Sequence, residues 1–429
     1  MDEPQINIVT HGCRANQYES DAMRARLSQC AVDAPLPIHI LNGCTVTKLA
    51  ERKARQAARR IRRSDPNALV IVVGCIADAV SLRLTRFDEA DLIAGGAWKP
   101  AIDEVVALAL AGRRGLLPDR TPHVLDRERS DGPSDRVRAH LKVQDGCSLA
   151  CSYCRPTQVR GASRSKSLAA ATREAGRLID LGFPEIVLTG INLAEYAPDD
   201  GRLPDLLRNI LGNRDLRRLR IASINPSGVT DALLDVFADD ERACRHFHVP
   251  LQSGDDRILA AMRRTYRASD CEETIDRIRN RLPDATFGAD LMVGFPAEDE
   301  AAFEATCEVA QRVRFSNAHI FRFSPRPGTD AVRLPARVSP SQARRRAERL
   351  DAICAESRRE LLDNRIGTTH DVLVEACRDG RWCGYTRDYF YVSFDSDIEP
   401  ALGAERPVRM TGTVNDHLWG EDADASRSR

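Results

Sequence analysis

The sequence predicts an α/β protein in three parts: an N-terminal parallel sheet, a central partial (β/α)6 barrel and a small C-terminal all-β barrel. Three observations lead to this prediction. Three apolar runs near the N-terminus each end in a Gly-Cys pair, six strand–helix units occupy the middle of the chain, and short alternating strands fill the last part. We place the three parts at residues 1–115, 136–364 and 366–429.

The N-terminal part repeats one strand–helix pattern three times. The strands are expected at 6–10, 38–41 and 69–73, and the helices between them at 17–29 and 47–64. Such units form a parallel sheet, whose strands all end at the same edge. A Gly-Cys pair follows each strand, so we expect the thiols of Cys13, Cys44 and Cys75 to converge there.

A stretch rich in Arg, Asp, Pro and Ser, from Gly115 to Asp135, predicts a linker. The six strands of the central part are then expected at 141–143, 185–189, 219–222, 246–249, 289–293 and 318–321, with helices such as 167–180 and 270–280 between them. Repeated strand–helix units of this kind are typical of a barrel, which carries its chemistry at the carboxyl ends of the strands.

The last part of the chain changes in pattern. A highly charged helix is expected at 340–362, followed by alternating strands at 371–375, 389–394 and 407–410, which predict a small β-barrel. The polar tail from Glu421 to Arg429 is expected to be disordered.

The charge pattern and the apolar runs of the sequence indicate what kind of protein this is. The 63 basic and 63 acidic residues cancel, but arginines cluster at 52–63 and 344–346, where they could bind phosphate or form solvated helix faces. The start of the sequence lacks the apolar run of a secretory signal, and no run is long enough to span a bilayer. We therefore expect a cytoplasmic protein, in which the 13 cysteines are reduced.

The strongest local motif is the CxxxCxxC spacing of Cys147, Cys151 and Cys154, directly after the first central strand. Three thiolates can hold three irons of a 4Fe–4S cluster and leave the fourth iron open. The alternatives are a zinc loop and buried thiols without metal. The N-terminal triplet offers the same donor set, with tight Gly-Cys turns as its metal-free alternative.

Residues Asp145 to Gly161 resemble the radical S-adenosylmethionine superfamily, specifically its methylthiotransferases. The resemblance covers nearly the whole chain, and Cys13, Cys44 and Cys75 match the cysteines of that family's N-terminal domain. The segments 16–20, 44–47 and 244–246 resemble the branch that acts on threonylcarbamoyladenosine. The segment 384–389 resembles a TRAM domain, an RNA-binding β-barrel.

The resemblance implies a flavodoxin-like N-terminal sheet domain, a radical S-adenosylmethionine core and two 4Fe–4S clusters. It implies that reductive cleavage of S-adenosylmethionine yields a deoxyadenosyl radical, which removes hydrogen from carbon 2 of the base. The implied substrate is the adenosine at position 37 of the tRNA anticodon loop, and the implied reductant is a flavodoxin- or ferredoxin-like protein. By the same resemblance, the cofactor-binding residues are Tyr153, Gly190, Asn192, Ser223, Asn225 and Gln252.

Three alternatives stay open: a methylthiotransferase for a ribosomal protein, one for isopentenyladenosine in tRNA, and a non-catalytic iron–sulfur RNA-binding protein. Gly380 and Gly384 are expected to bracket an exposed hairpin tip. Tyr385, Arg387 and Tyr389 are predicted to bind RNA beside it, unless the tyrosines close the core of the small barrel. His246 and His248 share a strand face, which favours a packed or hydrogen-bonded pair over metal ligands.

Overall fold

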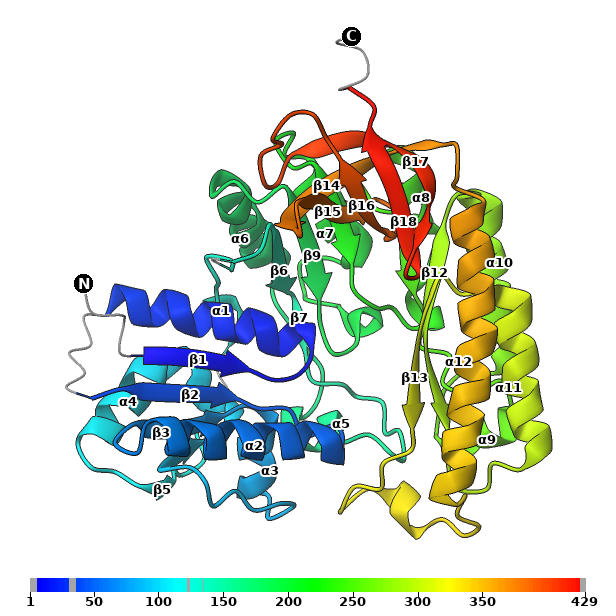
Figure 1. Cartoon of the computed structure of the whole chain (residues 1–429). Helices are drawn as coiled ribbons and strands as arrows, with labels where there is room; N and C mark the ends of the chain where they lie inside the picture. Colours follow the sequence, from blue (N-terminus) through cyan, green and yellow to red (C-terminus); the bar gives the residue numbers. More distant parts are fainter. Residues whose placement is uncertain (1–5, 31–35, 122–123, 134, 425–429) are drawn as a thin grey trace.

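The computed structural model describes residues 6–30, 36–121, 124–133 and 135–424. Its N-terminal unit is a five-stranded parallel sheet with helices on both faces (Figure 1). The strands are β1 (Ile6–Thr10), β2 (Ile38–Asn42), β3 (Leu69–Val73), β4 (Leu92–Ala94) and β5 (Gly115–Leu116). The helices are α1 (Arg14–Gln29), α2 (Lys48–Ser64), α3 (Cys75–Ser81) and α4 (Ile102–Leu110).

The order of the strands in this sheet is β1-β2-β3-β4-β5. A flavodoxin-like sheet has the order 2-1-3-4-5, so the flavodoxin-like prediction is wrong in its topology. Each connection moves the chain in the same direction across the sheet, and no strand in the described part of the chain lies on the far side of β1. The predicted linker is also partly regular, because Gly115–Leu116 pairs with β4 and Leu125 is buried.

The central unit contains six parallel strands in chain order, divided into two three-stranded sheets. A single bridge between Leu219 and Ala243 joins the two sheets. The strands are β6 (Arg138–Lys142), β9 (Glu185–Thr189), β10 (Arg218–Ile221), β11 (His246–His248), β12 (Thr286–Val293) and β13 (Asn317–Arg322). The helices are α6 (Leu168–Asp180), α7 (Leu203–Leu211), α8 (Asp231–Asp239), α9 (Asp256–Ala261), α10 (Ala268–Arg281), α11 (Glu300–Val313) and α12 (Pro340–Asp363).

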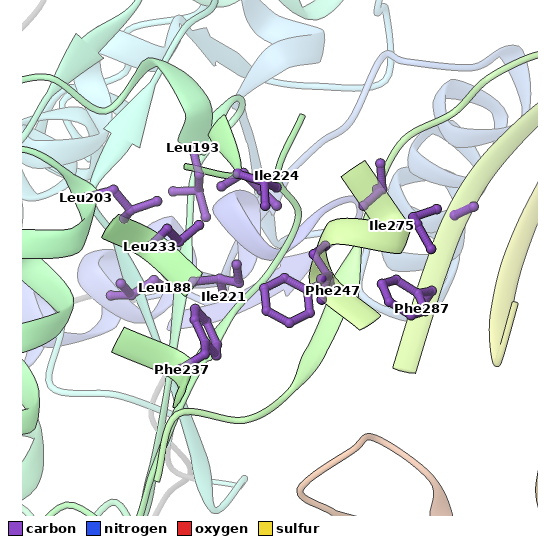
Figure 2. Close-up of a cluster of buried hydrophobic side chains, with 14 of the residues drawn as sticks. Leu188, Leu193, Leu203, Ile221, Ile224, Leu233, Phe237, Phe247, Ile275 and Phe287 are labelled. Carbon is purple, nitrogen blue, oxygen red and sulfur yellow. The ribbon is translucent and has the colours of Figure 1, made fainter. Parts of the chain in front are cut away.

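Alternation along the central strands separates an apolar face from a polar one. Leucine, isoleucine and phenylalanine side chains of the strands pack under the helices in one continuous core (Figure 2). In that core the rings of Phe237 and Phe247 lie 4.8 Å apart between centroids. The intervening strand residues, such as His246, His248 and Asp290, point to the opposite face. This core fixes the strand ends from which the functional loops leave.

The C-terminal unit is a closed five-stranded barrel, β14-β15-β16-β18-β17. Its strands are β14 (Thr369–Arg378), β15 (Arg381–Thr386), β16 (Tyr391–Asp395), β17 (Glu405–Val414) and β18 (His417–Asp422). The three predicted strands omit β15, because Gly384 resembles a turn residue in the sequence. It lies inside the strand instead, where an added Cβ would come within 1.7 Å of the Leu373 carbonyl oxygen.

Two further expectations about this barrel need correction. The tail was expected to begin at Glu421, but Glu421 and Asp422 belong to β18, while 425–429 lie outside the described residues. Tyr389 precedes β16 and has a positive φ of 71°, so the expected alternation along 389–394 begins only at Tyr391. Within the described ranges, no helix is long and apolar enough to cross a membrane.

A buried charge cluster joins the C-terminal barrel to the central unit. The Arg218 guanidinium donates to the carbonyl oxygens of Tyr385 and Asp371, at 2.7 and 2.9 Å. The Arg220 Nε donates to Glu185 Oε1 at 2.8 Å. Burial alone would raise the pKa of Glu185, but the neighbouring arginines, Arg220 foremost, hold it at about 2. Glu185 therefore stays ionised and balances two buried arginines.

We expect Glu185→Ala to lower the free energy of unfolding by about 3–5 kcal/mol, because it leaves buried cations uncompensated. Urea denaturation followed by circular dichroism measures this change. The matched control, Asp231→Ala, removes the partner of an exposed arginine and should cost under about 1 kcal/mol. In the wild type, the contribution of Glu185 should be complete above about pH 4.5 and lost as the pH falls towards 2. Equal losses in the two variants would refute this role of Glu185.

Candidate functional site

The loop that carries Cys147, Cys151 and Cys154 leaves the carboxyl end of the first central strand. The two-residue strands β7 (Gln144–Asp145) and β8 (Arg164–Ser165) pair with each other and clasp the loop at its base. Gly146 has a φ of +72°, and an added Cβ would come within 2.1 Å of the Ala162 carbonyl oxygen, so only glycine fits there. The clasp holds the three thiols at the edge where a parallel sheet presents its chemistry.

A chain of polar side chains links two of these thiols. Asn192 Nδ2 lies 3.7 Å from Cys147 Sγ, and Asn225 Nδ2 donates to Asn192 Oδ1 at 2.7 Å. Arg264 Nη2 donates to Asn225 Oδ1 at 2.6 Å, and its Nη1 lies 3.5 Å from Cys151 Sγ. The structure thus brings Asn192 and Asn225 together beside the cysteine loop. Arg264 was missed, because nothing in its sequence spacing points to the site.

A carboxylate also touches this loop. Glu195 Oε2 accepts from the backbone N–H of Ser148 at 2.9 Å, and Glu195 Oε1 lies 3.8 Å from Cys147 Sγ. Burial raises the pKa of Cys147, and the Glu195 charge adds to that rise. Glu195 is a second residue that the sequence did not reveal.

The other predicted cofactor residues are spread along the same strand ends. An added Cβ on Gly190 would come within 2.8 Å of Gln144 Oε1, which accepts from the backbone N–H of Asn192. The Tyr153 ring packs edge-on against Phe295, with 6.2 Å between centroids. Gln252 is buried with a φ of 69°, and Ser223 is half-buried after β10. Tyr153 thus belongs to the cysteine loop itself, and Gly190, Ser223 and Gln252 follow the carboxyl ends of β9, β10 and β11.

The N-terminal thiols converge at the edge of their own sheet. Cys13 precedes α1, Cys44 follows β2, and Cys75 is the first residue of α3. An added Cβ on Gly12 would lie only 2.8 Å from the Cβ of Cys44. Burial raises the pKa of Cys44 to about 12, with Cys75 and Cys13 adding to the rise. Thiols held protonated in this way lose their protons when they coordinate a metal cation.

Arg160 lies between the two thiol triplets. It ends α5 (Pro156–Arg160), the short helix directly after the cysteine loop, and α5 packs on α3 (Figure 1). Its Nε lies 3.2 Å from Cys75 Sγ, and its Nη1 donates to Glu19 Oε1 at 2.7 Å and to Asp145 Oδ1 at 2.8 Å. One side chain of the central unit therefore reaches a thiol of the N-terminal unit.

Other buried charges complete the contact around Arg160. The Lys142 ammonium pairs with Glu19 at 2.8 Å and with Glu128 at 2.7 Å, and Lys99 pairs with the other oxygen of Glu19. Although burial opposes ionisation, Arg160 and the two lysines hold the pKa of Glu19 well below its usual range. The two units are thus joined by ionised groups that are shielded from water.

The spacing of the thiols bears on the kind of metal centre. Tetrahedral zinc with Zn–S bonds of about 2.3 Å needs sulfurs about 3.8 Å apart. Among the described residues, the group of three ligating side chains whose donor atoms all lie within 4.8 Å of one another is His248, Asp290 and His319. Within the described residues, neither thiol triplet forms so close a group. His248 Nε2 lies 3.1 Å from Asp290 Oδ1, and the packed pair of His246 and His248 stays a prediction.

A buried arginine directly follows the cysteine loop. Arg155, directly after Cys154, is 1% exposed, yet its Nε and Nη2 have no hydrogen-bond partner among the described residues. Its Nη1 donates to Gln158 Oε1 at 3.0 Å, and the charged groups that act on its guanidinium are Arg326 and Glu51. The two sets of three thiols are the donors that fit iron–sulfur clusters.

The three predicted RNA-binding residues lie in the seam between the C-terminal barrel and the central unit. Tyr389 stacks on His246 with 4.9 Å between ring centroids and accepts from Arg14 Nη2 at 3.0 Å. Arg387 pairs with Glu405 at 3.0 Å, and Tyr385 stacks on Tyr389. The premise of an exposed hairpin tip is wrong for these residues, because the tight turn is Asp379-Gly380, away from the seam.

The sequence matches two family profiles. The profile described as Radical SAM superfamily matches residues 141–310, and the one described as Uncharacterized protein family UPF0004 matches residues 5–95. Among solved structures, the radical S-adenosylmethionine methyltransferase TsrM from Kitasatospora setae, with cobalamin and a 4Fe–4S cluster bound, superposes with a TM-score of 0.53. The match covers 77% of this chain and 74% of that one at 14% identity, which is a likeness of fold.

Two curated relatives cover almost the whole chain. The threonylcarbamoyladenosine tRNA methylthiotransferase MtaB of Thermotoga maritima is 34% identical, over 91% of both chains. The tRNA-2-methylthio-N(6)-dimethylallyladenosine synthase of Syntrophobacter fumaroxidans is 33% identical, over 97% of this chain and 95% of its own. The superfamily profile implies S-adenosylmethionine and one 4Fe–4S cluster as cofactors. The chain therefore belongs to the radical S-adenosylmethionine methylthiotransferase family, and within it resembles MtaB.

Proposed function

We propose that this enzyme is a tRNA methylthiotransferase that converts N6-threonylcarbamoyladenosine at position 37, beside the anticodon, to its 2-methylthio derivative. The observation that carries the proposal is the pair of thiol triplets, one at each sheet edge, which approach each other through Arg160. The resemblance to MtaB over 91% of the chain supports the choice of substrate.

The proposed cofactors follow from the two sets of three cysteine thiols. Cys147, Cys151 and Cys154 would hold a 4Fe–4S cluster with S-adenosylmethionine beside it, and Cys13, Cys44 and Cys75 would hold a second 4Fe–4S cluster. Bound there, the clusters supply a low-potential electron for reductive cleavage of S-adenosylmethionine and a place for the sulfur that is transferred. The residues proposed to contact S-adenosylmethionine are Tyr153, Gly190, Asn192, Ser223, Asn225 and Gln252.

The protein's own groups position and shield this chemistry. Arg264 and Asn225 hold the Asn192 amide at the cysteine loop, which fixes the direction of its donor groups. Arg160 offers a charged donor to Cys75, and such bonds stabilise a thiolate. The buried salt-bridge cluster around Glu19 keeps the two units docked and excludes water between them.

We further propose the three domains 1–115, 136–364 and 366–429, with the central one a partial (β/α)6 radical S-adenosylmethionine barrel and the last one a TRAM domain. The closed five-stranded barrel supports the TRAM assignment. The proposed partners are the tRNA anticodon loop, where the target base can be splayed out, and a flavodoxin- or ferredoxin-like electron donor.

The second candidate substrate is N6-dimethylallyladenosine in tRNA, which the 33% identical relative supports. Liquid chromatography and mass spectrometry of tRNA nucleosides from a deletion strain distinguishes the two candidate substrates. We expect 2-methylthio-N6-threonylcarbamoyladenosine to disappear and its unthiolated precursor to accumulate. Complementation with the intact gene is the control, and loss of the dimethylallyl product instead would assign the enzyme to the second substrate.

The assignment of two clusters predicts the metal content. Anaerobic reconstitution should give about eight irons and eight sulfides per chain. Cys13→Ala combined with Cys44→Ala and Cys75→Ala should halve both values, as measured by iron and sulfide analysis and by electron paramagnetic resonance. Four irons in the wild type, or zinc in either site, would contradict the two-cluster assignment.

The two triplets should differ in function. We expect Cys151→Ala to abolish reductive cleavage of S-adenosylmethionine, measured as 5′-deoxyadenosine, because its cluster would be lost. Cys44→Ala should keep that cleavage and lose methylthio transfer to tRNA. The matched control is Cys377→Ala, an exposed cysteine of the C-terminal barrel, which should leave both activities intact. Full methylthio transfer by Cys44→Ala would refute the role given to the N-terminal triplet.

A further inference from the structure

A large cavity lies where the N-terminal unit meets the carboxyl ends of β12 and β13. It has a volume of about 790 Å³, within the range of small-molecule and nucleotide sites. Its walls come from the start of α2, the ends of β12 and β13, the segment 324–332 and the start of α12. Thr47 and Leu49 are the two lining residues from the N-terminal unit.

Hydrogen bonds connect the wall of this cavity to the loops that carry the two cysteine triplets. The Ala331 backbone N–H donates to the Ser152 carbonyl oxygen at 2.8 Å, inside the CxxxCxxC loop. Arg326 Nη2 donates to Thr45 Oγ1 at 3.1 Å, and Thr45 directly follows Cys44. The segment between these two contacts therefore runs from one metal-binding loop to the other and borders the cavity.

Apolar side chains that are partly open to solvent line the cavity. Phe321 at the end of β13 is 42% exposed, and Leu49 on α2 is 49% exposed. Phe323 and Ile320 also line it. Two phenylalanine rings and a leucine offer flat apolar surface for an unstacked base, as aromatic platforms do in proteins that bind single-stranded RNA.

The charged residues that line the cavity are both basic. Arg322 and Arg337 line it, and no acidic side chain does. Both arginines are exposed, as are Lys48 and Arg52 on the neighbouring α2, and within the described residues none of the four has an ion-pair partner. Exposed arginines elsewhere are commonly paired, as Arg312 is with Glu272 across α10 and α11. Unpaired cations around an apolar hollow complement a nucleotide, which has an apolar base and an anionic phosphate.

We propose that this cavity is a subsite for an unpaired nucleotide of the RNA substrate, stacked on Phe321 and held at its phosphates by Arg322 and Arg337. This proposal rests on the tRNA-modifying function proposed above. An unpaired base bound here lies beside the wall that connects the two cysteine loops, so the subsite positions the RNA loop relative to both.

The test is a fluorescence anisotropy titration with a labelled synthetic anticodon stem–loop RNA and the full-length, cluster-loaded protein under anaerobic conditions. Phe321→Ala should weaken binding about fivefold to over a hundredfold, the range for loss of one base–aromatic stack, and Phe321→Trp should restore it. Leu181→Ala, which truncates a leucine 53% exposed at the end of α6, is the matched control and should bind as the wild type does. Iron content and circular dichroism verify that each variant is folded and loaded.

The salt dependence of RNA binding tests the two cavity arginines independently of Phe321. Arg322→Ala or Arg337→Ala should each lower the slope of log affinity against log salt by about 0.7. Arg312→Ala should leave that slope unchanged, because its ion pair lies on the outer helices. A duplex RNA without a loop should bind weakly and show no dependence on Phe321.

Failure of the subsite and failure of the proposed function give different results. Methylthio product from the wild type, with unchanged RNA affinity in Phe321→Ala and an unchanged salt slope in Arg322→Ala, would overturn the subsite alone. Phe321-dependent binding without any methylthio product would support the subsite and refute the function. Unchanged RNA binding with slower reduction by flavodoxin in these variants would overturn the RNA subsite and assign the cavity to the electron donor.

Discussion

The burial of Arg160 is the constraint on which the arrangement of the two cysteine-bearing units depends. Its guanidinium is shared among Cys75, Glu19 and Asp145, which belong to both units. Separating the units would leave Glu19 with fewer cations and Arg160 with fewer anions, in surroundings that solvate neither. The charges therefore have to be buried together, and this requirement sets the N-terminal sheet edge against the CxxxCxxC loop.

The same principle holds the C-terminal barrel in place. Arg218 and Arg220 reach out of the central sheet to carbonyl oxygens of Tyr385, Thr386 and Arg387, while Glu185 balances their charge. The Tyr389 ring is enclosed by Arg138, Arg220 and His246. The charges of Arg14 and Arg138 outweigh burial and lower the pKa of Tyr389. The barrel is thus fixed to the central unit by its aromatic corner, and Leu362 of α12 also packs into the barrel core.

Net charge says little about this protein, because its 63 basic and 63 acidic residues are distributed unevenly. Many arginines form ion pairs between helices or belong to the two buried charge clusters. Those around the cavity at β13 are exposed and unpaired among the described residues. The electrostatic field available to a polyanion therefore comes from a few unpaired side chains, and its location follows from the fold.

The strand–helix units and both thiol triplets could be predicted from the amino-acid sequence alone. A buried parallel strand needs a run of β-branched residues, and a Gly-Cys turn marks where it ends, so β1, β2 and β3 and the positions of Cys13, Cys44 and Cys75 could be predicted from local pattern. The CxxxCxxC loop was equally visible, because its three cysteines lie within eight residues.

The way in which these parts face one another follows from contacts between distant segments, which local sequence patterns do not encode. Arg160, Arg264 and Glu195 carry no spacing signal, since each meets its partner across a long sequence separation. Strand order in the N-terminal sheet was also undetermined, because the same units can be laid out in more than one sequence across a sheet. Gly384 was misassigned because a glycine needed for close backbone approach and a glycine needed for a turn look alike in sequence. Local pattern specifies elements, whereas charge burial and backbone packing between distant segments specify the site.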